Sequence, residues 1–487
     1  MTPDTPLDRP AAELAQDIRD KRLSPVELTE ALLRRIEALQ PVLNCFITIA
    51  GDEAMESARA AEAMVMAGKP LGPAHGLPFT VKDMVRTRGV RTTYGSLTRK
   101  DNIPDVDDLA VARLKRAGAI LIGKTTAPEF AHAPMTQSPL FGKTRNPWNR
   151  NHTPGGSSGG GATAIAAGLS LMSVESDSGG SVRIPASCCG TVGLKQSSGL
   201  LPDDTSLDVF NAMIYVNPMA RTTGDLAFMM DLMKGGTTGD PFSVHLAIPN
   251  FSATLDNSSI LSGMRIAVLP PPRGTRVDPE VQAAVEAAVA VLEDRGAIVD
   301  RDTGGLYPDD DLWDRSVTAW GAIQGSLRLH RYGESIKAHR DLISPSFLKL
   351  IEGSEALTAM DLQTALFTRT EVFHRVQSWF DDHDLIVMPT LTRTALSVDH
   401  DLDGRFQVDG AWFDMPMKHW FPNCHIANMS GHPALSVPCG FGAGNLPIGL
   451  QVMAPHGRDH IALACAAQIE AALHLTSKRP DFTAIDV

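Results

Sequence analysis

Two serines and one lysine are the residues whose type and spacing could perform nucleophilic catalysis. Ser157 and Ser181 lie in the glycine-rich segment 153–199, and Lys82 directly follows the apolar run 77–81. A serine hydroxyl is a weak nucleophile until a base removes its proton. An ordinary lysine has a pKa of about 10.4 and is protonated at neutral pH. Lys82 can therefore act as the base only if burial favours its neutral amine.

The residues directly before Ser181 are small and favour an anion-binding loop. Ser178, Gly179 and Gly180 supply consecutive N–H groups beside the candidate nucleophile, and two of these residues carry no side chain. Such a backbone can stabilise the oxyanion of a tetrahedral intermediate. A plain turn is the structural alternative for the two glycines. The charged residues on either side, Asp177 and Arg183, are expected to fix the loop through charged hydrogen bonds.

Two shorter pattern matches in this part of the chain are judged accidental. Residues 118–125 fit the phosphate-loop pattern, but their middle residues form a strand-like apolar run, whereas a phosphate loop must curl there. Residues 155–159 fit the elbow of α/β hydrolases, which needs a preceding strand. The prolines at 147 and 154 disfavour a central strand at that place. A flexible linker is also disfavoured, because apolar residues intersperse the glycines.

Several long motifs in order resemble the amidase signature family. They are H-G-L-P-F-T-V-K-D at 75–83, G-K-T-T-A-P-E-F at 123–130, F-G-K-T-R-N-P-W-N at 141–149, the glycine-serine segment, and the stretch 429–452. The resemblance spans most of the chain. It implies that Ser181 is the nucleophile and that Ser157 relays its proton to Lys82. It also implies a cis peptide between Gly156 and Ser157.

By position, the same resemblance places substrate-contacting backbone at Ala131, His132, Ala133 and Pro134. The chain also departs from the family pattern. Residues 196–198 read Gln-Ser-Ser where the family usually continues with proline, Asn217 replaces a usual glycine, and Thr126 replaces a common asparagine. None of these positions belongs to the catalytic set, so we expect altered walls around the site and unchanged chemistry.

The elements that must position these residues alternate between strands and helices. Helices are predicted over 11–40, with Ser24 as the N-cap and Pro25 at the first helical position, and over 52–67. Beyond residue 71, short apolar runs alternate with the helical stretches. They are the runs 77–81, 120–122, 264–269, 298–299 and 385–388, and the helical stretches 107–117, 161–168, 278–294 and 459–473. This alternation predicts an α/β fold with helices on both faces of a sheet.

The resemblance adds that the central sheet is mixed and largely parallel. No repeat or charged linker divides the sequence, so we expect a single domain over 1–487. Within it lie a helical region at about 1–68, a catalytic core at about 71–200 and a variable substrate-side region at 303–425. Five of the six tryptophans fall after residue 312. They either line an apolar pocket or pack in core and loops, and the sequence leaves both readings open.

The charge and composition of the chain restrict the kinds of partner that it is expected to bind. A net charge of −12 spread along the chain disfavours nucleic acid and anionic membranes. Neither a secretory leader nor an apolar run long enough to span a bilayer is recognisable, so a cytoplasmic protein is expected. The six cysteines do not suggest a disulfide framework, and the adjacent pair Cys188 and Cys189 suggests buried packing. His456 and His460 lack a third ligand, so neither a metal nor a cofactor is expected.

The sequence therefore predicts an amidohydrolase that cleaves a C–N bond of a small amide, anilide or carbamate through an acyl- or carbamoyl-enzyme on Ser181. A monomer or homodimer is expected. The main alternative is the glutamine-hydrolysing subunit of a tRNA-dependent amidotransferase, because the N-terminal residues 24–39 resemble that branch too. A Ser-His-Asp hydrolase and a non-catalytic binding protein rank below both.

Overall fold

One large sheet forms the centre of the molecule. The computed structural model describes residues 8–204, 206–211, 213–243, 248–255, 257, 259–301, 303–307 and 311–483. In this part of the chain the sheet has 11 strands. In spatial order they are β1 (Phe46–Ile49), β3 (Ile120–Thr125), β2 (Pro78–Lys82), β6 (Met172–Asp177), β8 (Tyr215–Ala220), β7 (Val192–Lys195), β14 (Ala434–Gly442), β15 (Leu446–Met453), β11 (Leu385–Pro389), β9 (Arg265–Val268) and β10 (Ile298–Asp300).

The sheet is mixed, as predicted. Parallel pairing occurs toward its two ends, where β2 pairs with β3 and β6, and β9 pairs with β10 and β11. The central strands from β6 to β15 pair antiparallel. Two small ribbons stand apart from the sheet, β4 (Gln137–Ser138) with β5 (Gly142–Lys143) and β12 (Phe406–Val408) with β13 (Ala411–Phe413).

Helices cover the sheet and extend beyond it. They are α1 (Ala11–Arg19), α2 (Pro25–Leu43), α3 (Gly51–Met66), α4 (Leu109–Arg116), α5 (Gly159–Ala166), α6 (Arg183–Cys189), α7 (Thr223–Met233), α8 (Phe251–Thr254), α9 (Pro279–Asp294), α10 (Leu312–Ala338), α11 (Pro345–Ser354), α12 (Ala359–Trp379), α13 (Pro416–His419), α14 (Cys424–Ser430) and α15 (Asp459–Leu473). The predicted cap is confirmed, because the Ser24 hydroxyl accepts from the N–H groups of Val26 and Glu27.

The alternation of side chains along β11 shows that both faces of the sheet are buried. Leu385 and Val387 join the core that contains α9 and α15, whereas Ile386 and Met388 join a second core with α10, α12 and α14. Successive residues of a strand point to opposite faces, so a strand covered on both sides reads as a continuous apolar run. The run at 385–388 is such a case, and the predicted α/β class with helices on both faces is confirmed.

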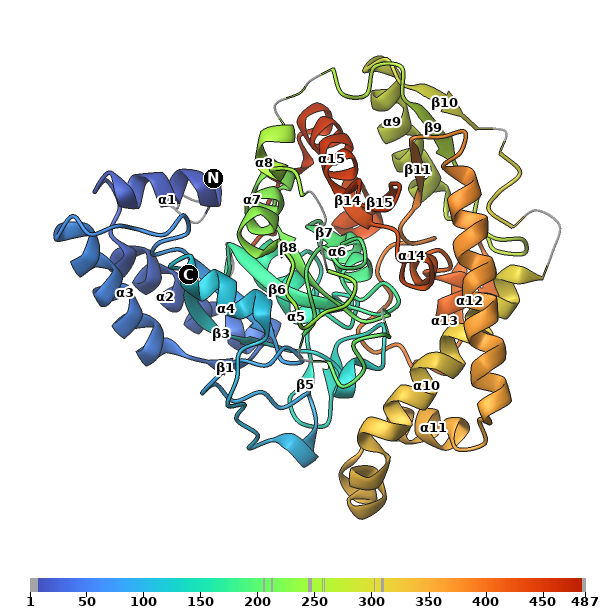
Figure 1. Ribbon diagram of the computed structural model, residues 1–487, viewed down its shortest axis with the longest axis horizontal. Helices are drawn as coiled ribbons and strands as arrows, with labels where there is room; N and C mark the ends of the chain where they lie inside the picture. The colour runs from blue at the N-terminus through green and yellow to red at the C-terminus, as the bar shows by residue number, and fades with distance from the viewer. Residues whose placement is uncertain are drawn as a thin grey trace.

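Two groups of helices lie at opposite sides of the molecule. Figure 1 shows α1 to α3 in blue on one side and α10 to α12 in yellow and orange on the other, with the catalytic segment of the sequence between them. Among the helices that the structure describes, none is long and apolar enough to cross a membrane. The sequence contained no clear signal for α10 to α12, of which α10 proves to line the site.

Candidate active site

Lys82 is the last residue of β2, and its side chain is completely buried. Its Nζ lies 2.8 Å from the Oγ of Ser157, 2.8 Å from the Oγ of Ser158 and 3.2 Å from the carbonyl oxygen of Ser176. The strand end thus places the amine between the start of α5 and the end of β6. The predicted pairing partners Lys82 and Ser157 are in direct contact.

Burial lowers the pKa of Lys82 to about 8, and the nearby carboxylates of Glu175 and Asp177 oppose this shift. An ion pair with the adjacent Asp83 would favour the charged form of the Lys82 amine. Asp83 instead accepts hydrogen bonds from the N–H groups of Thr93 and Gly95 and from the Thr93 hydroxyl. Lys82 is therefore a buried amine whose neutral form is accessible near neutral pH.

The neighbours of Lys82 determine where its lone pair can point. A neutral amine has two N–H groups and one lone pair. The Ser176 carbonyl can only accept, and the Ser158 hydroxyl donates its own proton to that same carbonyl at 3.3 Å. Both of these groups therefore accept from Lys82. Ser157 is the remaining neighbour, so its hydroxyl can donate into the lone pair of the lysine.

Ser157 follows a cis peptide bond from Gly156, as the resemblance implies. The backbone at Gly156 is closely packed, because an added Cβ would lie 2.8 Å from the Ala133 oxygen and from the Met135 nitrogen. A side chain at this position would displace the chain beside Ser157. Ser157 and Ser181 line the same cavity, which brings the two predicted serines together at its floor.

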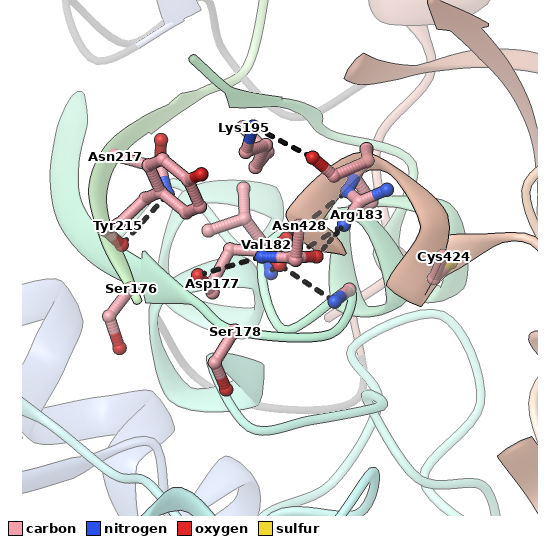
Figure 2. A network of polar contacts seen from close by, with 12 residues as sticks. Ser176, Asp177, Ser178, Val182, Arg183, Lys195, Tyr215, Asn217, Cys424 and Asn428 are labelled. Carbon is pink, nitrogen blue, oxygen red and sulfur yellow. Dashed lines mark hydrogen bonds and ion pairs between the residues drawn. The ribbon is translucent and has the colours of Figure 1, made fainter. Parts of the chain in front are cut away.

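A buried ion pair supports the loop that carries Ser181. The carboxylate of Asp177 accepts from the N–H of Gly180 at 2.7 Å and from the N–H of Val182 at 3.0 Å, and it pairs with Arg183 at 3.1 Å. Burial alone would raise the pKa of Asp177, but the Arg183 guanidinium and these hydrogen bonds hold it at about 2. Figure 2 shows these contacts of Asp177 with Val182 and Arg183.

Arg183 in turn is held by two residues from the far end of the sequence. Its guanidinium donates to the Asn428 side chain at 2.8 Å and to the Gln451 side chain at 2.8 Å. Asn428 also donates to the backbone oxygen of Asp177 at 3.1 Å. Figure 2 shows Asn428 beside Arg183 and Asp177 in this network. Sequence reasoning missed Asn428 and Gln451, because no local pattern connects them to the serine segment.

The N–H groups of the loop are not equivalent. Gly180 already donates to Asp177, whereas the N–H groups of Gly179 and Ser181 have no acceptor among the described residues. Of the three predicted oxyanion donors, Gly180 is thus engaged, Gly179 has a free N–H, and Ser178 accepts the Trp320 indole N–H through its carbonyl oxygen. The N–H of Ser181 is a further free donor. Gly180 has φ +116°, and a Cβ there would lie 2.5 Å from that of Cys424, so only glycine fits.

Trp320 of α10 fixes the loop from the other side. Its indole N–H donates to the carbonyl oxygen of Ser178 at 2.7 Å, and its ring would lie 2.8 Å from a Cβ at Gly179. No tryptophan lines the cavity of Ser181 in the part of the chain that the structure describes. Of the two readings left open for the tryptophans, packing is the one observed for Trp320 and for the fully buried Trp420.

A buried carboxyl, Glu175, lies behind the lysine on β6. Its Oε1 accepts from the Ser173 hydroxyl at 2.5 Å, while its Oε2 has no hydrogen-bond partner among the described residues. Burial raises the pKa of Glu175 above the usual range, and the charge of Lys82 opposes this shift. The sequence analysis did not single out Glu175, although an acidic residue amid the apolar residues of a central strand is an unusual feature.

The cavity in front of the serines has a volume of about 360 Å³. Phe130 and Ala131 line it, which agrees with the expectation for Ala131. His132, Ala133 and Pro134 do not line it. His132 instead hydrogen-bonds through its ring to the Glu129 oxygen and to the Ser346 hydroxyl, and burial lowers its pKa to about 4.

The departures from the family pattern lie away from this cavity. Asn217 accepts from the N–H of Gln196 at 3.0 Å, so these two unusual residues support each other. The hydroxyl of Thr126 bonds to that of Thr144 at 2.7 Å. None of these three residues lines the cavity of Ser181. The expectation of altered walls is therefore wrong for these positions, because their side chains point into neighbouring backbone.

No cluster of three or more histidine, cysteine, aspartate or glutamate side chains suited to a metal ion occurs within the described ranges. Most of the segment 118–125 is the strand β3, and its Lys124 is buried with its amine bonded to the Val85 oxygen and the Thr87 hydroxyl. Cys188 and Cys189 are buried free thiols in α6.

Comparison with known proteins decides the family. The sequence model of the Amidase family matches residues 27–463. The chain belongs to the amidase family. An acylamidase of Rhodococcus erythropolis is 32% identical over 96% of both chains. A glutamyl-tRNA(Gln) amidotransferase subunit from a Roseiflexus species is 35% identical over 88% of this chain and 89% of its own length.

Solved structures agree with this assignment to the amidase family. A bacterial aryl acylamidase of the amidase signature family superposes with a TM-score of 0.89 at 28% identity, covering 98% of this chain and 100% of its own. The 6-aminohexanoate cyclic dimer hydrolase superposes with a TM-score of 0.86, also at 28% identity, covering 98% of this chain and 99% of its own. The chain is thus a hydrolase of the family that acts on carbon–nitrogen bonds other than peptide bonds.

Proposed function

We propose that this amidase family member hydrolyses the C–N bond of small amides, anilides or carbamates through a covalent intermediate on Ser181. The observation that carries the proposal is the contact of the buried Lys82 amine with Ser157, at the floor of the cavity that Ser181 also lines. A buried neutral lysine can serve as a general base at physiological pH, and no histidine lines this cavity among the described residues.

Acylation begins when the Oγ of Ser181 attacks the carbonyl carbon of the substrate. Its proton passes to the Oγ of Ser157, and the proton of Ser157 passes to the lone pair of Lys82. The carbonyl oxygen becomes an oxyanion, for which the N–H groups of Gly179 and Ser181 are the available donors. One such donor typically contributes roughly 100- to 1000-fold to the rate.

Collapse of the intermediate breaks the C–N bond. Lys82 returns its proton to Ser157, and Ser157 protonates the departing nitrogen, so the leaving group departs as a neutral amine. Water then attacks the acyl-enzyme, or the alkoxycarbonyl-enzyme that a carbamate leaves after its amine has departed, by the same proton route in reverse. The products are the free amine and a carboxylic acid, or a carbonic acid half-ester when the substrate is a carbamate, and Ser181 regains its proton.

A substrate panel tests the proposal on the purified chain. Acyl 4-nitroanilides and N-aryl carbamates are incubated with the enzyme, release of the aromatic amine is recorded, and the mass of the trapped intermediate is measured. The expected result is turnover by the isolated chain, with the acyl or alkoxycarbonyl mass on Ser181. Complete inactivity on amides, anilides and carbamates contradicts the proposal.

The alternative function is the release of ammonia from glutamine for a partner protein. It is supported by the amidotransferase subunit that is 35% identical to this chain. Under that alternative, glutamine is the required substrate and the isolated chain depends on its partner for activity. Partner-independent hydrolysis of nitroanilides excludes it, whereas strict glutamine dependence together with co-purification of a partner supports it.

A further inference from the structure

One face of α10 lines the same cavity as the serines. Gln324, Leu327, Arg328, Arg331 and Tyr332 line the cavity from this helix. Residues three and four apart lie on the same side of a helix, which places the polar ends of this set side by side. A long helix with two arginines facing a cavity is unusual for a site expected to take small neutral amides.

Arg328 is a buried cation without a hydrogen-bonding partner. Only 7% of the residue is exposed, yet it makes no hydrogen bond or ion pair in the described structure. It faces the ring of Trp320, whose centroid lies 5.8 Å from the guanidinium carbon. Burial lowers the pKa of Arg328 to about 10, so the group remains charged at neutral pH. An isolated buried charge is costly unless something pairs with it.

Two other buried basic side chains, Arg183 and Lys195, have protein acceptors for their N–H groups. Arg183 is bonded to Asp177, Asn428 and Gln451. Lys195 donates to two backbone carbonyls at 2.8 and 3.0 Å. Arg328 differs from both because the space in front of its guanidinium is the cavity rather than protein. Its missing acceptor must therefore come from whatever occupies the cavity.

The surroundings of Arg328 add donors rather than acceptors. The Nε2 of Gln324, one helical turn away, is buried without a partner, and the Nε of Arg331 is likewise unpaired. Four arginines and two aspartates line the cavity, and Asp108 is already bonded to Arg86 at 3.1 Å. The part of the cavity near α10 is therefore rich in unused N–H groups and suits an anion.

We propose that Arg328, with Gln324, binds a carboxylate of the substrate, so that the preferred substrates are amides that carry an anionic group away from the scissile bond. This proposal rests on the proposed function, because it names the substrate class of the same cavity. A planar carboxylate can accept two parallel N–H groups of a guanidinium, one on each oxygen, and it adds a charge pairing that a neutral amide oxygen lacks.

Matched substrates test this specificity. Glutaryl 4-nitroanilide carries a carboxylate on its acyl group, pentanoyl 4-nitroanilide has a methyl group in its place, and 4-(pentanoylamino)benzoate carries the carboxylate on the leaving amine. The expected result is that one of the two acids has a higher kcat/KM than the neutral pentanoyl 4-nitroanilide. Whichever acid is preferred shows which side of the amide faces α10.

The variant Arg328→Met should lower the acid-to-neutral ratio of kcat/KM by roughly 10- to 100-fold, the usual range for a charged hydrogen bond. Arg315→Met is the matched control, because Arg315 lies on the exposed side of the same helix and pairs with Asp311 and Glu371. The control should leave the ratio unchanged. An unchanged ratio in Arg328→Met overturns the inference.

Binding to an inactive enzyme separates this inference from the proposed function. Glutaryl 4-nitroanilide is titrated into Ser181→Ala and into Ser181→Ala/Arg328→Met, and binding should weaken roughly 10- to 100-fold in the double variant. If the neutral anilide is turned over but glutaryl 4-nitroanilide binds equally well to Ser181→Ala and to Ser181→Ala/Arg328→Met, the inference fails and the proposed function stands. If no amide is turned over but binding depends on Arg328, the proposed function fails and the carboxylate site stands.

Discussion

The amine of Lys82 and the hydroxyl of Ser157 lie 2.8 Å apart, although they come from the end of a strand and the start of a helix. The peptide bond before Ser157 is cis, and Ser181 lines the same cavity. This relationship makes a lysine the proposed base of the site.

The base should give the enzyme a rising pH profile. Catalysis needs the neutral amine, so kcat/KM should increase with pH through about 8, the pKa of buried Lys82. Lys82→Met removes the base while filling similar space, and it should lower kcat by roughly 100- to 10,000-fold. The pH dependence of nitroaniline release measures both effects. A profile governed by a group with a pKa near 6.5 would instead indicate a histidine base.

The carboxyl of Glu175 should tune that base. A negative charge near Lys82 favours the protonated amine, so Glu175→Gln should lower the pKa of Lys82 and move the rising limb of the profile to lower pH. The glutamine keeps the size of the side chain. Ser158→Ala serves as a comparison, because it removes a contact of Lys82 without removing a charge. A limb that moves to higher pH in Glu175→Gln contradicts this account.

Part of the site could be predicted from the sequence alone. Lys82, Ser157, Ser181, Asp177 and Arg183 lie in local motifs, so their types and order were enough to name them. The sequence also predicted five of the 11 strands described in the sheet, namely β2, β3, β9, β10 and β11, since runs such as 385–388 are apolar on both faces. These signals are local in the sequence, so they can be recognised without knowledge of the tertiary structure.

The remaining residues of the site come from distant parts of the chain. Asn428 and Gln451 reach Arg183 across 245 and 268 residues. Trp320 and Arg328 lie on α10, whose sequence does not show a strong apolar face because several of its sides are covered. Only the packing of α10 against the serine loop reveals that an arginine faces the cavity and a tryptophan supports the nucleophile.

The ion pair under the loop should be essential for stability. Arg183→Met leaves the Asp177 carboxylate buried with an unpaired charge, and it should destabilise the fold by about 3–5 kcal/mol. Urea denaturation followed by circular dichroism measures this loss. Lys349→Met is the control, since its pair with Asp403 is exposed and worth at most about 1 kcal/mol. Equal losses in the two variants would contradict the role given to Asp177 and Arg183.

The loop should tolerate no side chain at Gly179. A Cβ there would lie 2.8 Å from the Trp320 ring, so Gly179→Ala should displace the N–H groups beside Ser181 and lower kcat by roughly 100-fold or more. Gly321→Ala is the control on α10, because nothing lies within 4 Å of its added Cβ. Steady-state kinetics on a nitroanilide compares the two. Similar activity in both variants would show that the loop is free to move.

The most direct test of the account is the site of covalent labelling. The purified enzyme is treated with a fluorophosphonate, digested, and the modified peptide is sequenced by mass spectrometry. The account predicts a single adduct on Ser181, absent from Ser181→Ala and strongly slowed in Lys82→Met. An adduct on Ser157 or on another serine, with Ser181 unmodified, would contradict the central claim.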